Sequence, residues 1–150
     1  MVQSYSELYL ADAKDNLAAA FDYAINVCGY TGEQFSNFFI QSGYASKFEQ
    51  GNPAVITGIS GIELARKVIS YAYPDSNYPE PLYTEEYSLE YWTGWALAEY
   101  QWITGKRFID IFTKIPFADI AALYHLHHEM DIQYFIETME QKYNTAASAK

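Results

Sequence analysis

The sequence predicts an all-α protein: a compact single-domain bundle of about seven or eight short-to-medium helices around a central aromatic-rich helix. Apolar residues recur at steps of three and four along much of the chain, which is the period of an α-helix. Serine and threonine stand where these segments begin, and glycine or proline stands where they end. The chain has 150 residues, half of them hydrophobic, which is about one domain with its own core.

Capping signals divide the N-terminal half into helices. The first helix is expected from Ser6 to Cys28, with Gly29 as the residue that ends it. The second begins at Thr31, which has the capping-box partner Gln34 three residues later. The other elements expected in this half are a short helix over 44–49, a loop in which Ala54 to Thr57 is extended at most, and a helix that begins at the Ser60/Glu63 capping box and ends before Pro74.

A proline-rich segment separates the two halves of the chain. No helix forms at the proline density of residues 74–87, so the sequence predicts a long loop there. Ser88 then caps the aromatic-rich helix, and Gly105 ends it. We expect one helical domain over residues 1–143. Its last elements are a short helix from Lys106, another from Pro116 and a final helix over about 131–143, followed by a flexible tail at 144–150.

The net charge limits the partners that the chain can bind. It is −10, from 19 acidic and 9 basic residues. Free nucleic acid is therefore not an expected direct partner, because phosphate binding needs Lys and Arg, whereas a basic protein fits the charge. The chain opens without a signal-peptide pattern, carries one cysteine and lacks an apolar run of about 18 residues. We therefore expect a cytoplasmic protein that does not contact the membrane.

The segment "EYWTGWALAEYQW", from Glu90 to Trp102, holds all three tryptophans of the chain. On a helix it is apolar on nearly every side, which is typical of a central, buried helix. Gly94 and Ala98 would let another backbone approach closely. The alternative is an aromatic cage or stacking platform, but the stacking of nucleobases favours basic neighbours, which this segment lacks.

Glu99 and a histidine cluster are the residues that could take part in catalysis or metal binding. We expect Glu99 at the rim of the aromatic helix, beside Lys106 or Arg107. The sequence contains no phosphate-binding loop and no nucleophile elbow, so no catalytic residue and no cofactor are assigned. In "HLHHE" a helix-linking turn is favoured over a metal site. The weak metal-ligand candidates are His125, His128 and Glu129.

The proline-rich loop is also acidic and rich in tyrosine. No basic residue stands between Lys67 and Lys106. Such a loop offers charge for electrostatic steering and rigid rings for contact area, so we expect it to dock a basic protein. The alternative is a solvated loop whose tyrosines lie on the domain. The candidate partner-binding residues are Tyr78, Glu80, Tyr83, Glu85, Glu86, Tyr87 and Glu90.

Several stretches carry a family resemblance over roughly residues 8 to 136. They include "SGYASKFEQGNP", "GISGIEL" and "EYWTGWALAEYQW". The chain resembles a poorly characterised family of small proteins from gut and soil Firmicutes, some of which continue into a helix-turn-helix domain and lie near toxin-like genes. The resemblance implies an antitoxin or adaptor. The sequence reaches Lys150 without a helix-turn-helix segment, so operator binding is not expected.

The preferred functional hypothesis is a non-enzymatic protein-interaction module. It would be an antitoxin-like neutraliser or adaptor that binds a basic protein partner, such as a toxin or nuclease. One alternative is an acidic, phage-type inhibitor that mimics nucleic acid on a nuclease or defence enzyme. Another is a small-molecule-binding or enzymatic helical domain, with Glu99, His125 or His128 in a pocket beneath the aromatic helix.

Overall fold

The computed structural model describes residues 3–82, 84 and 86–148 of the chain. Every regular element in these ranges is helical, which confirms the predicted all-α class. None of their helices combines the length and the apolar character that crossing a membrane requires. In chain order the elements are η1 (Glu7–Tyr9), α1 (Leu10–Asp22), the π-helix η2 (Tyr23–Val27), α2 (Gly32–Gln41), α3 (Tyr44–Glu49), α4 (Pro53–Ile56), α5 (Gly61–Ala72), α6 (Leu89–Thr104), α7 (Phe108–Lys114), α8 (Phe117–Ala121), α9 (Tyr124–His127) and α10 (Ile132–Ser148).

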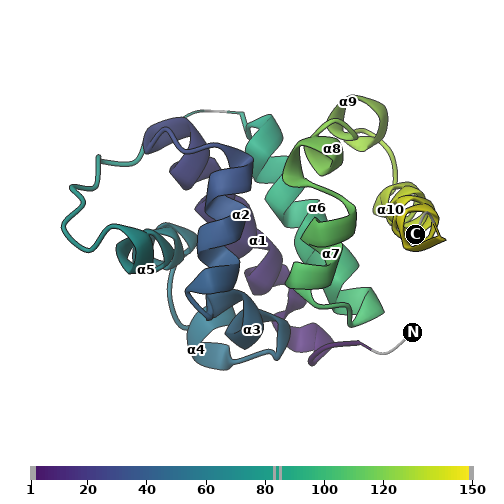
Figure 1. Ribbon diagram of the computed structural model, residues 1–150, viewed down its shortest axis with the longest axis horizontal. Helices are drawn as coiled ribbons and strands as arrows, with labels where there is room; N and C mark the ends of the chain where they lie inside the picture. Colours follow the sequence, from purple (N-terminus) through teal and green to yellow (C-terminus); the bar gives the residue numbers. More distant parts are fainter. Residues whose placement is uncertain (1–2, 83, 85, 149–150) are drawn as a thin grey trace.

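Helices α1 and α6 form the most extensive helix pair of the fold. Their contact depends on Gly94, because a Cβ atom added there would lie 2.7 Å from the carbonyl oxygen of Leu17. Gly61, the first residue of α5, is equally confined, 2.4 Å from the carbonyl oxygen of Asn16. Two glycines thus let α6 and α5 approach the backbone of α1. In Figure 1, α5 lies at one end of the molecule and α10 at the other.

Phenylalanine rings fill the space between α1 and its other neighbours. Phe21 of α1 stacks on Phe117 of α8, with ring centroids 4.8 Å apart, and meets the edge of Phe35 of α2 at 4.9 Å. Phe39 and Phe108 extend this cluster towards α7, with centroids 5.1 Å apart. All five rings are buried. Hydrophobic burial of this kind is the main source of stability for a domain of this size.

The predicted helix boundaries at caps are found in the structure. Thr31 and Gln34 make the reciprocal bonds of a capping box. The Ser60 and Ser88 side chains accept backbone hydrogen bonds at the starts of α5 and α6. Gly105 ends α6 with φ +71°, a conformation that suits glycine.

Two local predictions were wrong. Ala54 to Thr57 were expected to be extended at most, but α4 covers Pro53–Ile56, because the Asn52 side chain accepts the Ala54 N–H and proline suits a first turn. The tail expected at 144–150 is helical as far as Ser148, since α10 continues past Tyr143. Between α5 and α6 the described part of the predicted loop contains no helix.

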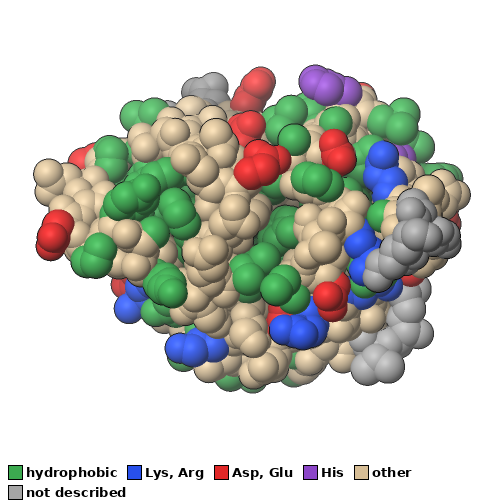
Figure 2. All heavy atoms as spheres, in the orientation of Figure 1, with side chains coloured by type: hydrophobic (Ala, Val, Ile, Leu, Met, Phe, Trp, Pro, Cys, Tyr) green, Lys and Arg blue, Asp and Glu red, His purple; other side chains and the backbone are tan. Residues whose placement is uncertain are grey.

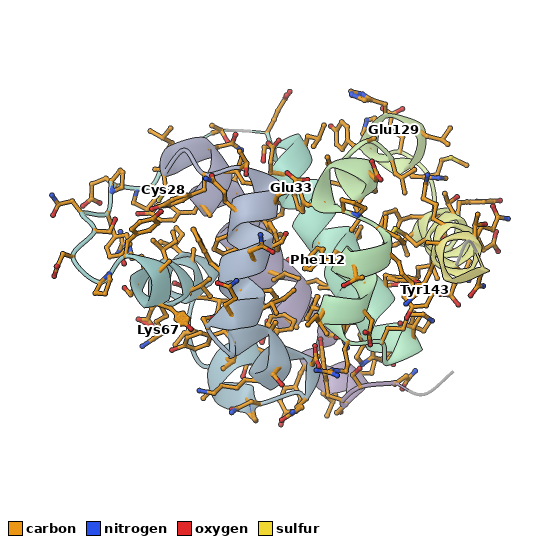
Figure 3. All side chains as sticks on the ribbon, in the orientation of Figure 1. Cys28, Glu33, Lys67, Phe112, Glu129 and Tyr143 are labelled. Atoms are coloured by element: carbon orange, nitrogen blue, oxygen red, sulfur yellow. The ribbon has the colours of Figure 1, made fainter. Side chains whose placement is uncertain are left out.

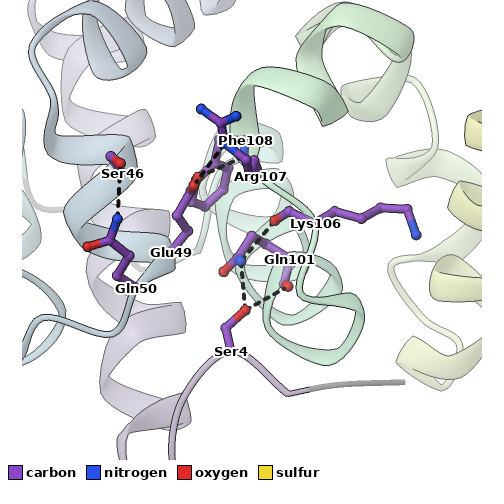
Figure 4. A network of polar contacts seen from close by, with 8 residues as sticks. All are labelled: Ser4, Ser46, Glu49, Gln50, Gln101, Lys106, Arg107 and Phe108. Carbon is purple, nitrogen blue, oxygen red and sulfur yellow. Dashed lines mark hydrogen bonds and ion pairs between the residues drawn. The ribbon is translucent and has the colours of Figure 1, made fainter.

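Polar contacts fix the segment around Ser4 against the end of α6. Ser4 accepts a hydrogen bond from the Gln101 side chain, which also donates to the carbonyl of Lys106 (Figure 4). Beside them, the Glu49 carboxylate accepts the N–H of Phe108 at 2.9 Å and pairs with Arg107. This carboxylate satisfies an orphan donor at the start of α7.

Candidate functional site: an aromatic cleft

The aromatic helix α6 is buried at one end and lines a cleft at the other. Trp102 is 4% exposed, and its indole N–H donates to the carbonyl of Tyr5 at 2.8 Å. Trp92 and Trp95 pack against the core with one side and line a cleft of about 490 Å³ with the other. The prediction that the whole aromatic segment is buried was therefore wrong for these two indoles. The residues of this aromatic cleft are Asp15, Tyr87, Tyr91, Trp92, Trp95, Tyr124, His127, His128, Met130 and Ile132.

Stacked rings form two sides of the aromatic cleft. Tyr87 and Tyr91 stack nearly parallel, with centroids 4.0 Å apart and an interplanar angle of 5°. Tyr124 and His128 stack with centroids 4.1 Å apart and an angle of 13°. Trp92 meets the edge of Tyr124 at 5.6 Å. The rings that line the cleft are therefore held in place by contacts with one another.

Glu99 lies near the cleft but does not line it. Its carboxylate pairs with Lys14 of α1, and the Lys14 ammonium lies 3.4 Å from the centroid of the Trp95 ring. The predicted position beside Lys106 or Arg107 was wrong, because the close α1–α6 contact brings Lys14 to Glu99 first. The two other bases pair elsewhere, Lys106 with Glu140 at 3.0 Å and Arg107 with Glu49 at 3.6 Å.

Asp15 supplies a carboxylate to the aromatic cleft. It is exposed and forms no ion pair with any residue that the structure describes. Burial, and next the charge of Asp15, raise the pKa of the Tyr91 hydroxyl above its ordinary value. The Asn26 side chain donates to both Asp22 and Glu90, at 2.8 Å and 3.0 Å, so two further carboxylates lie together beside the first turn of α6.

The histidine cluster contributes two residues to the cleft, of which the sequence had suggested one, His128. His128 lines it, and its Nδ1 lies 2.7 Å from the carbonyl oxygen of Tyr124. Glu129 lies 3.8 Å from His128 and is exposed, and His125 does not line the cleft. In Figure 3, Glu129 is far across the molecule from Cys28. Across residues 3–82, 84 and 86–148, no group of three His, Cys, Asp or Glu side chains could hold a metal ion.

His127 is a cleft residue that sequence reasoning missed. It is buried, and its Nε2 lies 3.1 Å from the Thr138 hydroxyl of α10. Its Nδ1 is buried with no hydrogen-bond partner among the described residues. Asp15, Tyr124, Met130 and Ile132 were missed as well. The sequence signal for them was indirect. Helix α6 carries more aromatic residues than its contact with α1 alone can bury.

The predicted partner-binding residues that the structure describes separate into three groups. Tyr78 is half-buried, and its hydroxyl donates to the Arg66 carbonyl at 3.1 Å, so it holds the loop on the domain, as in the alternative arrangement. Tyr87 lines the aromatic cleft, and Glu90 lies beside it. Glu80 and Glu86 are exposed, whereas Tyr83 and Glu85 lie outside the described residues.

Charged side chains are unevenly distributed over the surface. On the face shown in Figure 2, Lys and Arg lie along the lower and right-hand margins, and most acidic side chains lie in the upper half. A second, polar hollow of about 450 Å³ is lined by Asp12, Asp15 and Ser60, among other residues. Two carboxylates make this hollow unsuitable for a phosphate, although it lies at the start of α5.

Comparison of the chain with protein-family models, with curated proteins and with solved structures found no match. The geometry of the aromatic cleft therefore carries the functional argument.

Proposed function

We propose that this protein is a protein-interaction module that binds a basic protein partner through the aromatic cleft and its acidic surroundings. The observation that carries this proposal is the cleft itself, which tyrosine and tryptophan rings line together with Asp15, a carboxylate that forms no ion pair among the described residues. Interface hot spots are rich in tyrosine and tryptophan, and carboxylates around them select basic partners.

The rim of the cleft supports a protein partner. Tyr87 is 75% exposed and Met130 is 44% exposed, although both are large and largely apolar. On the neighbouring segments, Leu126 and Tyr134 are exposed as well. A group of exposed apolar residues is typical of an interaction surface, because its burial upon binding is favourable. A macromolecule would cover this rim, whereas a ligand confined to the cleft would leave much of it exposed.

The family resemblance suggests a biological role for this binding. We propose that the module acts as an antitoxin-like neutraliser or as an adaptor, with a toxin or nuclease as the basic partner. The exposed acids Glu80 and Glu86 of the loop would add long-range attraction, while Tyr78 keeps the loop on the domain. The same binding could also inhibit a nuclease by mimicking nucleic acid. In that case DNA and this protein would compete for one surface of the partner.

A second candidate function is the binding of a small molecule. The volume of the cleft, about 490 Å³, lies within the range of about 300–1,000 Å³ that is usual for ligand sites. Asp15 and the imidazoles of His127 and His128 would supply its polar contacts. A thermal-shift screen of metabolites tests this candidate, since a ligand that binds only the folded state raises the melting temperature.

Affinity capture with matched variants tests the proposed function. The variant Y87S/M130S removes exposed apolar groups from the rim, and the control Y71S/L8S removes a tyrosine and an aliphatic side chain, both exposed, elsewhere. We expect the wild type and the control to capture the same basic protein from the source cell, and the rim variant to lose it. The captured protein is then purified, and its affinity is measured with each variant. Equal affinity for the rim variant and the control would contradict the proposal.

A further inference from the structure

We propose that the aromatic cleft binds the guanidinium group of an arginine side chain that the partner presents. The inference rests on the proposed function and specifies the chemistry of its central contact. Such a site must attract a cation, must be flat rather than round, and must offer a carboxylate beside aromatic rings.

The charges around the cleft favour a cation. Asp15 lines it without an ion pair among the described residues, and the carboxylates of Asp22 and Glu90 lie at the adjacent start of α6. The Lys14 ammonium lies beside the Trp95 ring, and Glu99 neutralises its charge. An occupying anion would meet the Asp15 carboxylate at close range, so phosphate and carboxylate ligands are disfavoured.

The shape of the cleft favours a planar cation over a compact one. Tyr87 stacks on Tyr91 with one face and is 75% exposed, so its other face is free for a ligand. A guanidinium group stacks on such a ring while its edge donates hydrogen bonds to a carboxylate. Lys14 already covers one face of Trp95, which leaves the tyrosines as the principal stacking partners. An ammonium group forms the same ion pair but has no flat face that could stack on the rings.

The indole N–H signals give a direct test, because the three tryptophans differ in environment. The probes are N-acetyl-arginine methylamide, its neutral citrulline analogue and N-acetyl-lysine methylamide, each titrated into uniformly ¹⁵N-labelled protein. We expect the arginine probe to shift the Trp92 and Trp95 signals with a Kd on the order of 1 mM. The Trp102 signal should not move, because its N–H is bonded to Tyr5 inside the protein.

Variants that remove one negative charge show whether Asp15 recognises the guanidinium group. The exposed position of Asp15 lets D15N fold, and D75N makes the same change in net charge at an exposed site outside the aromatic cleft. We expect D15N to weaken binding of the arginine probe at least about tenfold, because a charge-assisted hydrogen bond is lost. D75N should change it by less than about twofold, since distant exposed charges are screened.

The outcomes separate this inference from the proposed function. Binding of the arginine probe, with weaker binding of the lysine and citrulline probes and loss in D15N, supports the guanidinium site. Equal binding of the citrulline probe would overturn it, because the occupant would then be selected by shape alone. If no probe shifts Trp92 or Trp95 while the rim variant Y87S/M130S still loses its partner, the inference fails and the proposed function stands. If partner capture is also unchanged, both fail.

Discussion

Lys14 of α1 and Glu99 of α6 form an ion pair directly beside the Trp95 ring, whose centroid lies 3.4 Å from the Lys14 ammonium. The two side chains are only 9% and 16% exposed. The pair therefore links the two central helices of the fold to a wall of the aromatic cleft. It also allows a charged residue to lie within a helix that is apolar on most sides.

Removal of Lys14 alone should destabilise the protein more than removal of the whole pair. In K14M the Glu99 carboxylate stays largely buried without its counter-ion, which we expect to lower the free energy of unfolding by about 2–3 kcal/mol. In K14M/E99M most of this loss should be regained. Urea denaturation of both variants and of the wild type measures the difference, and a double variant no more stable than K14M would contradict it.

The α1–α6 contact predicts an unusual response to a helix-favouring substitution. In an open helix, Gly→Ala stabilises by about 1 kcal/mol. At Gly94 the added methyl group would lie 2.7 Å from the Leu17 carbonyl oxygen, so we expect G94A to lose about 2 kcal/mol instead.

A glycine in open space serves as the control for this substitution. Nothing lies within 4 Å of a Cβ at Gly43, whose φ of +84° asparagine tolerates. G43N should therefore cost less than about 1 kcal/mol. Thermal and urea unfolding measure both variants, and a stabilised G94A would show that the two helices are farther apart.

Two tyrosine hydroxyls hold the proline-rich loop on the domain. The Tyr23 hydroxyl donates to the Pro79 carbonyl at 2.6 Å, and that of Tyr78 donates to the Arg66 carbonyl. We expect Y23F/Y78F to be cleaved by proteinase K between residues 74 and 82 at least about fivefold faster, because local opening becomes easier. The variant Y71F, at an exposed tyrosine, should be cleaved at the wild-type rate.

The reactivity of Cys28 should depend on pH in a defined way. Burial raises the pKa of its thiol above the ordinary value, and this effect exceeds the opposing contributions of Tyr23 and Arg66. Because the thiolate is the nucleophile, less of it is present near pH 8, and alkylation should be slow there. The rate of reaction with iodoacetamide should rise with pH to a midpoint above that of the urea-unfolded chain. A midpoint at or below the unfolded value would show that the positive charge of Arg66 dominates.

The sequence predicted those features that depend on near neighbours in the chain. Thr31 and Gln34, Ser88 and Gly105 act on backbone groups within a few residues, so their capping roles could be read directly. The close approach at Gly94 was also foreseen, since a missing side chain permits contact with another helix.

The candidate site could not be predicted, because it depends on which sides of α6 other helices cover. Trp92, Trp95 and Trp102 look alike in the sequence, yet Trp102 bonds to Tyr5 of the N-terminal segment, whereas Trp92 and Trp95 line the cleft. The opposite wall comes from Tyr124 and His128, whose placement depends on the turns around α9. Likewise, Glu99 pairs with a lysine 85 residues away in the sequence, and no local rule identifies such a partner.

Three successive residues of α1 contact three different parts of the fold. Lys14 pairs with Glu99, Asp15 lines the aromatic cleft, and the Asn16 side chain donates to the carbonyls of Ile56 and Ile59. Successive side chains on a helix point about 100° apart, so an inserted or deleted residue just before them would turn all three away together. Homologues that retain the cleft should therefore align through this helix without gaps, even where many of its amino acids have diverged.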